Sequence, residues 1–277
     1  MPARGRPRLR NADTYNSRVN AVLNVSGYRF SRLDDPHALR DVLHSAAAQR
    51  HLKGTILLAH EGINLFLAGA EADVEALLTL LRAQPGLQAF EVKRSWSEAQ
   101  PFRKLLVKVK PEIIRMNHPA IAPQVGRAPA VDAQTVKRWL DQGHDDEGRP
   151  VVTLDTRNGF EVDHGTFDGA IDWRLHKFSD FPAALQAHQA ELEGKTVVSF
   201  CTGGIRCEKA ALVMREAGLD HVWQLEGGIL KYFEEAGNAH FHGSCFVFDE
   251  REALDAELQP ATASCHSGLD PASSDGD

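Results

Sequence analysis

The sequence predicts an α+β domain followed by an α/β domain, in which a parallel β-sheet carries helices on both faces. Three observations lead to this prediction. Before residue 110, apolar stretches follow the order strand, helix, strand, strand, helix, strand. Beyond residue 129, short apolar strands alternate with helices, as they do in parallel sheets. Residues 111–129 separate the two patterns, because they contain four prolines and little periodicity.

The first domain shows alternating strand and helix periods with turn residues between them. Its predicted strands are residues 21–25, 55–59, 63–67, 90–93 and 105–109, and its predicted helices are centred on residues 39–47 and 74–81. His60-Glu61-Gly62 reads as the turn between two strands, and Pro85-Gly86 follows the second helix. The order β-α-β-β-α-β is that of the ferredoxin-like arrangement, to which residues 105–109 would add a strand.

The second domain begins with Asp132, a plausible N-cap for a helix through Leu140. Its predicted strands are residues 151–154, 197–200 and 222–225, and its further helices are 207–217 and a segment after Gly228. In such sheets the functional groups lie beyond the carboxyl ends of the strands. Asp155, Cys201 and Glu226 all fall at such ends.

These patterns give five segments: a disordered basic arm (1–17), the ferredoxin-like domain (18–112), a linker (113–129), the α/β domain (130–240) and a mostly disordered extension (241–277). No apolar run follows the arginines of the arm, so it is not a secretory signal. No stretch approaches membrane-spanning length. The four cysteines are too few and too clustered for a disulfide framework. We therefore expect a cytoplasmic protein with free thiols.

The charge is unevenly placed on a chain whose formal net charge is -7. Residues 91–115 carry seven Lys or Arg against three Glu, a local excess of +4. Such a patch can hold a phosphate backbone, although lysines also protect a solvated strand edge from aggregation. The candidate RNA-contacting residues are Lys93, Arg94, Arg103, Lys104 and Lys108.

The loop Cys201-Thr202-Gly203-Gly204-Ile205-Arg206 carries the chemistry predicted from the sequence. A predicted strand runs into Cys201 and a helix follows the loop, so the positive end of the helix dipole faces the sulfur. The two glycines allow a tight curl with inward N–H groups, and Arg206 adds a positive charge. All three features favour the thiolate and would hold a bound anion.

A buried, inert cysteine is the alternative for Cys201, but packing alone requires neither the glycines nor Arg206. Cys207 lies on the helix side of the loop. It is either a small packing residue or a resolving thiol for Cys201.

The ten residues from Cys201 to Ala210, Cys-Thr-Gly-Gly-Ile-Arg-Cys-Glu-Lys-Ala, resemble the loop of the TrhO family, the rhodanese-domain tRNA uridine hydroxylases. Five other segments agree with the resemblance: Asp155-Thr156-Arg157, Gly169-Ala170-Ile171, Glu226-Gly227-Gly228-Ile229, Glu61-Gly62-Ile63-Asn64 and Cys245-Phe246-Val247-Phe248-Asp249. The stretch from Arg103 to Pro119 is also similar. The resemblance covers about Val22 to Arg251 and implies an acylphosphatase-like first domain and a rhodanese second domain.

The resemblance implies an oxidoreductase of monooxygenase type that converts the wobble uridine of tRNA to 5-hydroxyuridine. Cys201 would be essential, as thiolate or persulfide, with Thr202, Gly203, Gly204, Ile205 and Arg206 forming the anion-binding loop and Asp155, Arg157 and Glu226 supporting it. Molecular oxygen would be the co-substrate, an unidentified donor would supply electrons, and tRNA would be the partner. No obligate protein partner is indicated.

Two alternative functions remain open from the sequence. One is a rhodanese-type sulfurtransferase that carries sulfane sulfur as a Cys201 persulfide, and the other is a non-catalytic module that binds an anion in the loop. The sequence has no dinucleotide fingerprint and no haem attachment motif. His240, His242, Cys245 and Cys265 could be drawn as a zinc site, but they lack a paired Cys-x-x-Cys, so no metal site is predicted.

Overall fold

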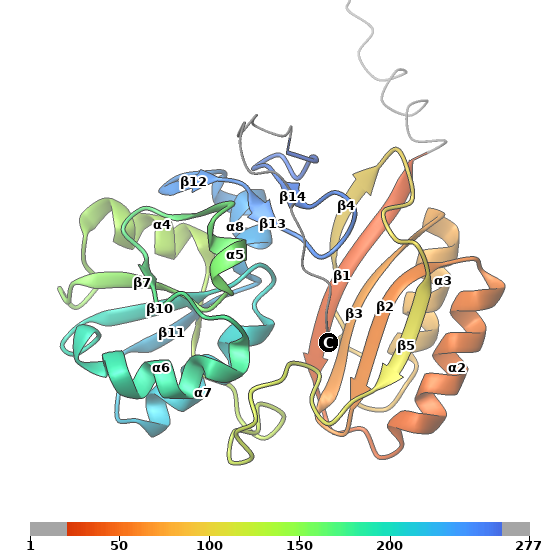
Figure 1. Cartoon of the computed structure of the whole chain (residues 1–277), viewed down its shortest axis with the longest axis horizontal. Coiled ribbons are helices and arrows are strands. Elements are labelled where there is room, and N and C mark those ends of the chain that lie inside the picture. Colours follow the sequence, from red (N-terminus) through yellow and green to blue (C-terminus); the bar gives the residue numbers. More distant parts are fainter. Residues whose placement is uncertain (1–20, 262–277) are drawn as a thin grey trace, which may run out of the picture.

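The computed structural model describes residues 21–261. The predicted basic arm and the end of the predicted tail, including Cys265, lie outside these described residues. Two β-sheets stand side by side, each with its own helices, and the C-terminal extension lies near the junction between them (Figure 1). The molecule therefore has two cores, as the sequence predicts.

The first domain has the predicted order of strands and helices. Its elements are β1 (Val22–Phe30), α2 (Pro36–Gln49), β2 (Lys53–Ala59), β3 (Gly62–Gly69), α3 (Glu71–Arg82), β4 (Lys93–Ser97) and β5 (Leu105–Val109). The sheet order is β4-β1-β3-β2-β5, in which β5 runs parallel to β2. The strand predicted at residues 90–93 is wrong in position, since β4 starts at Lys93. Phe90 instead sits in a turn after Leu87, and its ring is buried in the core.

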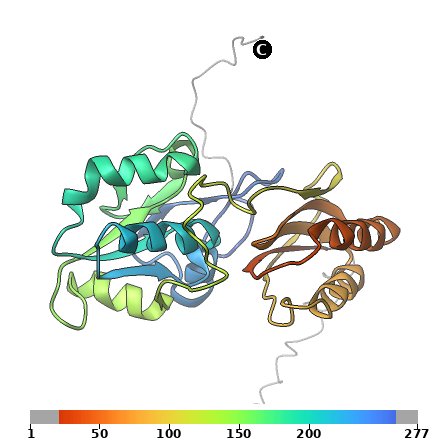
Figure 2. The ribbon, with the colours of Figure 1, turned by 90° about the horizontal axis from the view of Figure 1, so that it is seen from below.

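Alternation along the strands divides this sheet into two unlike faces. Leu23 and Val25 of β1 and Leu65 of β3 pack into the core beneath α2 and α3. Figure 2 shows both helices on the side of the sheet away from the second domain. The opposite face carries Ser26 and Tyr28, and we call it the open face. The open face is the one that can meet the second domain.

The second domain is a parallel sheet covered on both sides. Its strands are β6 (Ala130–Val131), β7 (Val151–Asp155), β9 (Ile171–Asp172), β10 (Thr196–Phe200) and β11 (Val222–Leu225), in the order β6-β11-β10-β7-β9. One apolar cluster lies under α4 (Ala133–Gln142) and α8 (Gly228–Ala236), and another under α6 (Phe181–His188) and α7 (Ile205–Glu216). The short helix α5 (Gly159–Val162) follows β7. The predicted N-cap holds, because the Asp132 carboxylate accepts a hydrogen bond from the Thr135 amide at 2.9 Å.

The C-terminal extension is folded as far as the structure describes it. β12 (Phe241–Gly243) pairs with β8 (Gly165–Phe167), and β13 (Cys245–Phe246) pairs with β14 (Ala253–Leu254). Buried side chains at Phe241, Cys245 and Val247 hold the segment in place. A mostly disordered extension is therefore the wrong prediction for residues 241–261.

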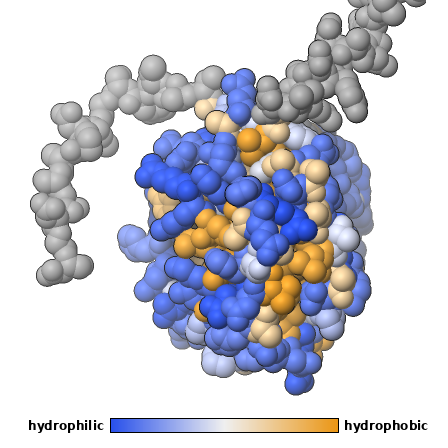
Figure 3. Space-filling model, turned by 90° about the vertical axis from the view of Figure 1, so that its right-hand side faces the viewer, coloured by the Kyte–Doolittle hydropathy of each residue, from blue (hydrophilic) through white to orange (hydrophobic). Residues whose placement is uncertain are grey.

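The outer surface of the first domain is largely hydrophilic, with apolar patches between the polar side chains (Figure 3). Among residues 21–261, no helix is both long enough and apolar enough to cross a lipid bilayer.

Candidate active site

The loop after β10 holds Cys201 in a ring of backbone groups. The Cys201 sulfur accepts a hydrogen bond from the amide of Gly204 at 3.1 Å. Gly204 is the N-cap of α7 and has φ of 99°, a conformation that favours glycine. The helix begins at Ile205, two residues earlier than predicted, so its positive end lies closer to the sulfur than the sequence implied.

The start of α8 holds the same loop from the other side. The amide of Ile229 donates to the Cys201 carbonyl at 3.0 Å, and the amide of Leu230 donates to the Thr202 carbonyl at 3.1 Å. Gly228 has φ of +67°, and a Cβ there would lie 2.4 Å from the Cys201 oxygen. A side chain at this position would push the loop away, which explains the glycine pair after Glu226.

These contacts stabilise the thiolate of Cys201. Burial of the sulfur, which is 1% exposed, by itself opposes ionisation. A hydrogen bond from Cys207, the charge of Arg206 and the amides of Arg206 and Gly204 outweigh it, and they lower the pKa of Cys201 to about 5. The sulfur is thus buried among amides that face it, so it is held as an anion at neutral pH.

The position of Cys207 agrees with the packing role that the sequence left open, and the resolving role stays a prediction. Its side chain is fully buried, and its sulfur lies 3.7 Å from the Thr156 hydroxyl. Burial and the neighbouring Cys201 thiolate raise the pKa of Cys207 well above its ordinary value. Cys207 therefore stays protonated, and its thiol helps to lower the pKa of Cys201.

Arg206 is not a free cation. Its guanidinium forms two hydrogen bonds of 2.6 and 2.7 Å with the carboxylate of Glu161, and both side chains are buried. Its charge still favours the Cys201 thiolate, but both terminal nitrogens of its guanidinium are occupied by Glu161. The expected effect of its charge on the thiolate is therefore present, while anion binding by the loop stays a prediction. Glu161 is absent from the predicted site residues, although Asn158 and Glu161 are spaced as a capping box.

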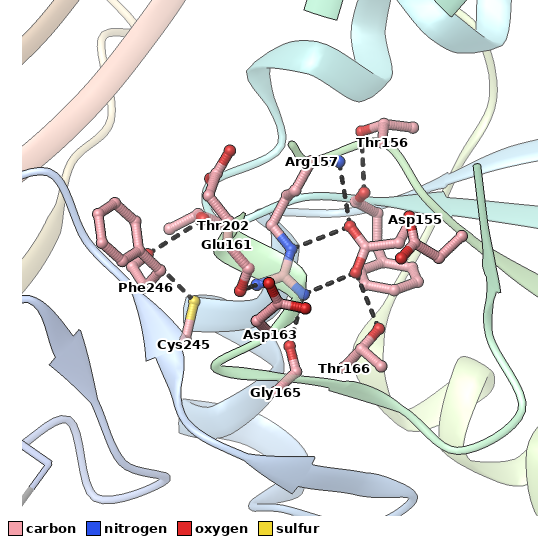
Figure 4. Close-up of polar contacts among 12 residues, drawn as sticks. Asp155, Thr156, Arg157, Glu161, Asp163, Gly165, Thr166, Thr202, Cys245 and Phe246 are labelled. Carbon is pink, nitrogen blue, oxygen red and sulfur yellow. Dashed lines mark hydrogen bonds and ion pairs between the residues drawn. The ribbon is translucent and has the colours of Figure 1, made fainter. Parts of the chain in front are cut away.

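Asp155 and Arg157 form a brace beside the loop (Figure 4). Arg157 donates to Asp155 through Nη2 at 2.6 Å, and Thr166 donates to the same carboxylate at 2.8 Å. The Arg157 guanidinium also binds the carbonyl of Gly165 at 2.6 Å. Both charges are fully buried, so the pair fixes the chain around α5 and β8.

Glu226 lies at the carboxyl end of β11, as expected, but its carboxylate points toward solvent. It accepts a hydrogen bond from Lys231 at 2.8 Å, and about half of its side chain is exposed. Among the described contacts, none joins this carboxylate to the Cys201 loop. Its neighbour Gly228 is the residue that touches the loop.

Two residues of α7 that the sequence analysis did not single out reach across to the first domain. Glu208 accepts a hydrogen bond from the Tyr28 hydroxyl at 3.1 Å and another from Arg127 Nε at 3.1 Å. Lys209, 2% exposed, lies 2.9 Å from Glu61 and 2.7 Å from Glu112. We call this group the interdomain contact. Its two residues on α7, Glu208 and Lys209, directly follow Cys207 in the chain.

A cavity of about 430 Å³ lies between the open face and the loop. Its walls include Tyr28, Phe66 and Lys93 of the first domain and Thr202 and Gly203 of the loop. Lys93 crosses to the loop, where its Nζ donates to the Gly203 carbonyl at 2.9 Å and lies 5.9 Å from the centre of the Tyr28 ring. Burial lowers the pKa of this lysine.

The five predicted RNA-contacting residues do not form one patch. Arg94 is among the residues that line the cavity, but its guanidinium pairs with Glu75 of α3 at 2.8 Å, and Arg103 binds Glu250 of the C-terminal extension at 2.8 Å. Lys104 and Lys108 are exposed near the β5 edge of the sheet. Of the five, Lys93 is the one that contacts the loop.

His240, His242 and Cys245, three of the residues considered for a zinc site, do not form a metal-binding cluster in the part of the chain that the structure describes. His240 binds Asp141 at 2.7 Å, and His242 binds Asp168 at 2.9 Å. Cys245 is buried, and Cys265 lies outside the described residues. Residues 21–261 hold no cluster of three His, Cys, Asp or Glu side chains suited to a metal ion.

Two family models match the chain, one for each domain. Residues 22–113 match the UPF0176 acylphosphatase-like domain, and residues 132–235 match the rhodanese-like domain. The predicted fold class is thereby confirmed for both domains.

Curated relatives are similar over most of the chain. The tRNA uridine(34) hydroxylase of Variovorax paradoxus is 62% identical over 245 residues, which are 88% of this chain and 93% of that protein. The enzyme of the same name from Bordetella petrii is 64% identical over 244 residues, covering 88% and 96%. Among solved structures, the rhodanese-like domain of an Anabaena protein is 18% identical with a TM-score of 0.35, covering 54% of this chain and 98% of that one.

Proposed function

Because the chain belongs to the family of tRNA uridine(34) hydroxylases, we propose that its reaction takes place at Cys201, in the cavity between the two domains. The protein is an oxidoreductase that hydroxylates uridine 34 of tRNA. The groups of this chain that carry out the reaction are assigned below from the geometry of the Cys201 loop and the cavity.

The buried thiolate at the junction of the domains is the single observation that carries the proposal. A thiolate held by the Gly204 and Arg206 amides and by the Cys207 thiol is poised as a nucleophile at neutral pH. The cavity that ends at its loop has the volume typical of small-ligand sites. A wobble base turned out of the anticodon loop would enter there, since a single-stranded loop makes unstacking inexpensive.

We place the new hydroxyl group at ring carbon 5 and take its oxygen from molecular oxygen. Transfer of one oxygen atom into the C–H bond, with release of the other as water, consumes two electrons and two protons. An external donor therefore has to supply the electrons. Cys201, as thiolate or as persulfide, would act on the ring, while the cavity walls position it and limit access of water.

Lys93 is the residue that we propose to contact the tRNA at the cavity. One of its three N–H groups is used on Gly203, so others remain for a uracil oxygen or a phosphate. Lys104 and Lys108 would meet the backbone further along the sheet, where only electrostatic attraction is needed. We propose a cytoplasmic enzyme whose macromolecular substrate is tRNA.

The test compares tRNA nucleosides from cells that lack the protein and carry either wild type, Cys201→Ser or Cys245→Ala. Wild type and Cys245→Ala should restore 5-hydroxyuridine, because Cys245 lies outside the loop, whereas Cys201→Ser should leave it absent. Full modification by the serine variant would overturn the role of Cys201. Unchanged nucleosides in all strains, together with a thiosulfate-dependent persulfide on Cys201, would favour the sulfurtransferase alternative.

A further inference from the structure

Three phenylalanines stand together beside the cavity, and one of them, Phe248, lines it. The ring of Phe246 lies 5.3 Å from that of Phe160 and 5.1 Å from that of Phe248, both edge to face, and Phe160 lies 6.5 Å from Phe248. We call Phe160, Phe246 and Phe248 the aromatic cluster. Nothing described so far gives it a task.

The cluster presents ring surface to solvent. Phe160 is 49% exposed and Phe248 is 52% exposed, while Phe246 is half-buried between them. The large apolar side chains that are exposed among residues 21–261 are these two and the distant Val42 and Val125. An exposed phenylalanine costs solvation free energy, so two of them in contact beside a reaction site call for a ligand.

The cluster is attached to the catalytic loop at two points. Phe160 precedes Glu161, which holds Arg206 with hydrogen bonds of 2.6 and 2.7 Å. The carbonyl of Phe246 accepts a hydrogen bond from the Thr202 hydroxyl at 3.3 Å, a contact drawn in Figure 4. Phe248 lines the cavity together with Thr202 and Arg206. The rings are therefore held in a fixed place next to the cavity.

The size and setting of the cluster fit a nucleobase better than a protein. Two half-exposed phenylalanine rings offer roughly 200 Å² between them, well below what a stable protein interface buries. Because the two rings are nearly perpendicular, a single base can stack on the face of one ring and contact the edge of the other. Arg115, an exposed cationic side chain that could meet a phosphate, lines the same cavity.

We propose that the aromatic cluster stacks against the nucleotide next to uridine 34, on one side of it in the anticodon loop. The inference rests on the proposed function and deepens it. With the neighbour held on Phe160 and Phe248, the chain between the two nucleotides places uridine 34 in the cavity. The cluster reads no base identity, because every base offers a ring face.

The experiment uses tRNA ligated from synthetic fragments, with 2-aminopurine at either position that flanks uridine 34. Wild-type protein should quench the fluorescence at one of the two positions, and the double variant Phe160→Ala/Phe248→Ala should not. The variant should bind roughly tenfold or more weakly. Val125→Ala removes an exposed apolar side chain elsewhere and serves as the matched control, and Phe248→Trp should retain binding.

A second tRNA, abasic at the quenched position, tests direct contact. The missing base should weaken binding to the wild type but add little loss in the double variant, since both changes remove one interaction. Independent losses, or no quenching at either position, would overturn the proposal. A wild-type dimer that the double variant converts to monomer would overturn it in favour of contact between two copies. Failure of the wild type to hydroxylate unmodified tRNA would instead contradict the proposed function, whatever the fluorescence shows.

Discussion

The two sets of buried charges around α7 differ in what they connect. Inside the second domain, Glu161 and Arg206 pair within the wall of the Cys201 loop. Further along the helix, Glu208 accepts a hydrogen bond from Tyr28 of the neighbouring domain. Lys209 forms ion pairs with Glu61 and Glu112 of that domain. The first set governs the ionisation of the thiol, and the second governs where the cavity walls stand. Catalysis and substrate positioning can therefore be disturbed separately.

The largest effect should come from breaking the first set. Arg206→Ala leaves the buried carboxylate of Glu161 without its charged partner, so we expect the free energy of unfolding to fall by about 3–5 kcal/mol. The pKa of Cys201 should rise toward its ordinary value, because a cause of its lowering is removed. Urea unfolding measures the loss of stability, and the ultraviolet absorbance of the thiolate, followed against pH, measures the pKa of Cys201.

The double variant Arg206→Met/Glu161→Gln separates stability from ionisation. It leaves no unpaired charge in the site, so most of the lost stability should return. The pKa of Cys201 should remain raised, since no cation is restored. Recovery of both quantities together would contradict the assignment of Arg206 to the thiol.

Breaking the second set should cost less and act on a different property. Lys209→Met removes the cation shared by Glu61 and Glu112, which are partly exposed, so we expect a loss of about 2 kcal/mol. The pKa of Glu112, now held low by Lys209 and two amides although its partial burial raises it, should increase. Proteolysis within residues 113–129 should become faster, and KM for tRNA should rise more than kcat falls. An unchanged thiolate titration is the control.

The pH dependence sharpens the same comparison. The folded-state pKa of Cys201 is lowered to about 5, so the thiolate should form as pH rises through that value, not near 9.0. A thiol with a lowered pKa stabilises the folded state above its unfolded pKa, and this contribution declines as pH falls toward 5. The difference in ultraviolet thiolate absorbance between wild type and Cys201→Ser, followed against pH, reports the titration of Cys201. A midpoint above about 8 would contradict stabilisation of the thiolate by the loop amides and Arg206.

The smallest effect should come from Glu226→Gln. The carboxylate pairs with Lys231 at the surface, and exposed pairs contribute about 1 kcal/mol or less. Neither the thiol pKa nor the hydroxylation rate should change by more than about twofold. A large loss of rate would restore the supporting role that the sequence suggested for this residue.

Local signals explain which parts of the fold were predictable. Residues 105–109 form the predicted strand, and Asp132 caps the predicted helix, because alternation and capping are encoded within a few residues. The strand predicted at 90–93 was displaced because Phe90 satisfies its apolar character in the core and not in the sheet. Tertiary packing decided between two uses of the same residues.

The site was predictable only as far as it lies within one loop. Cys201, its glycines and the following helix are contiguous, so their geometry follows from the chain itself. Glu161 is 45 residues from Arg206, and Glu61 is 148 residues from Lys209. Neither pairing has a local signal, and the occupation of Arg206 by Glu161 could not be foreseen. The pairing of Arg103 with Glu250 likewise joins residues that are far apart in the chain.

The first turn of α7 has a mechanical consequence. Cys207, Glu208 and Lys209 are consecutive in a helix, whose hydrogen bonds make one turn move as a unit. Cys207 contributes to the lowered pKa of Cys201, while the next two side chains bind residues of the first domain. We therefore expect a tilt of one domain against the other to shift Cys207, so that docking of the tRNA would alter the reactivity of the Cys201 sulfur.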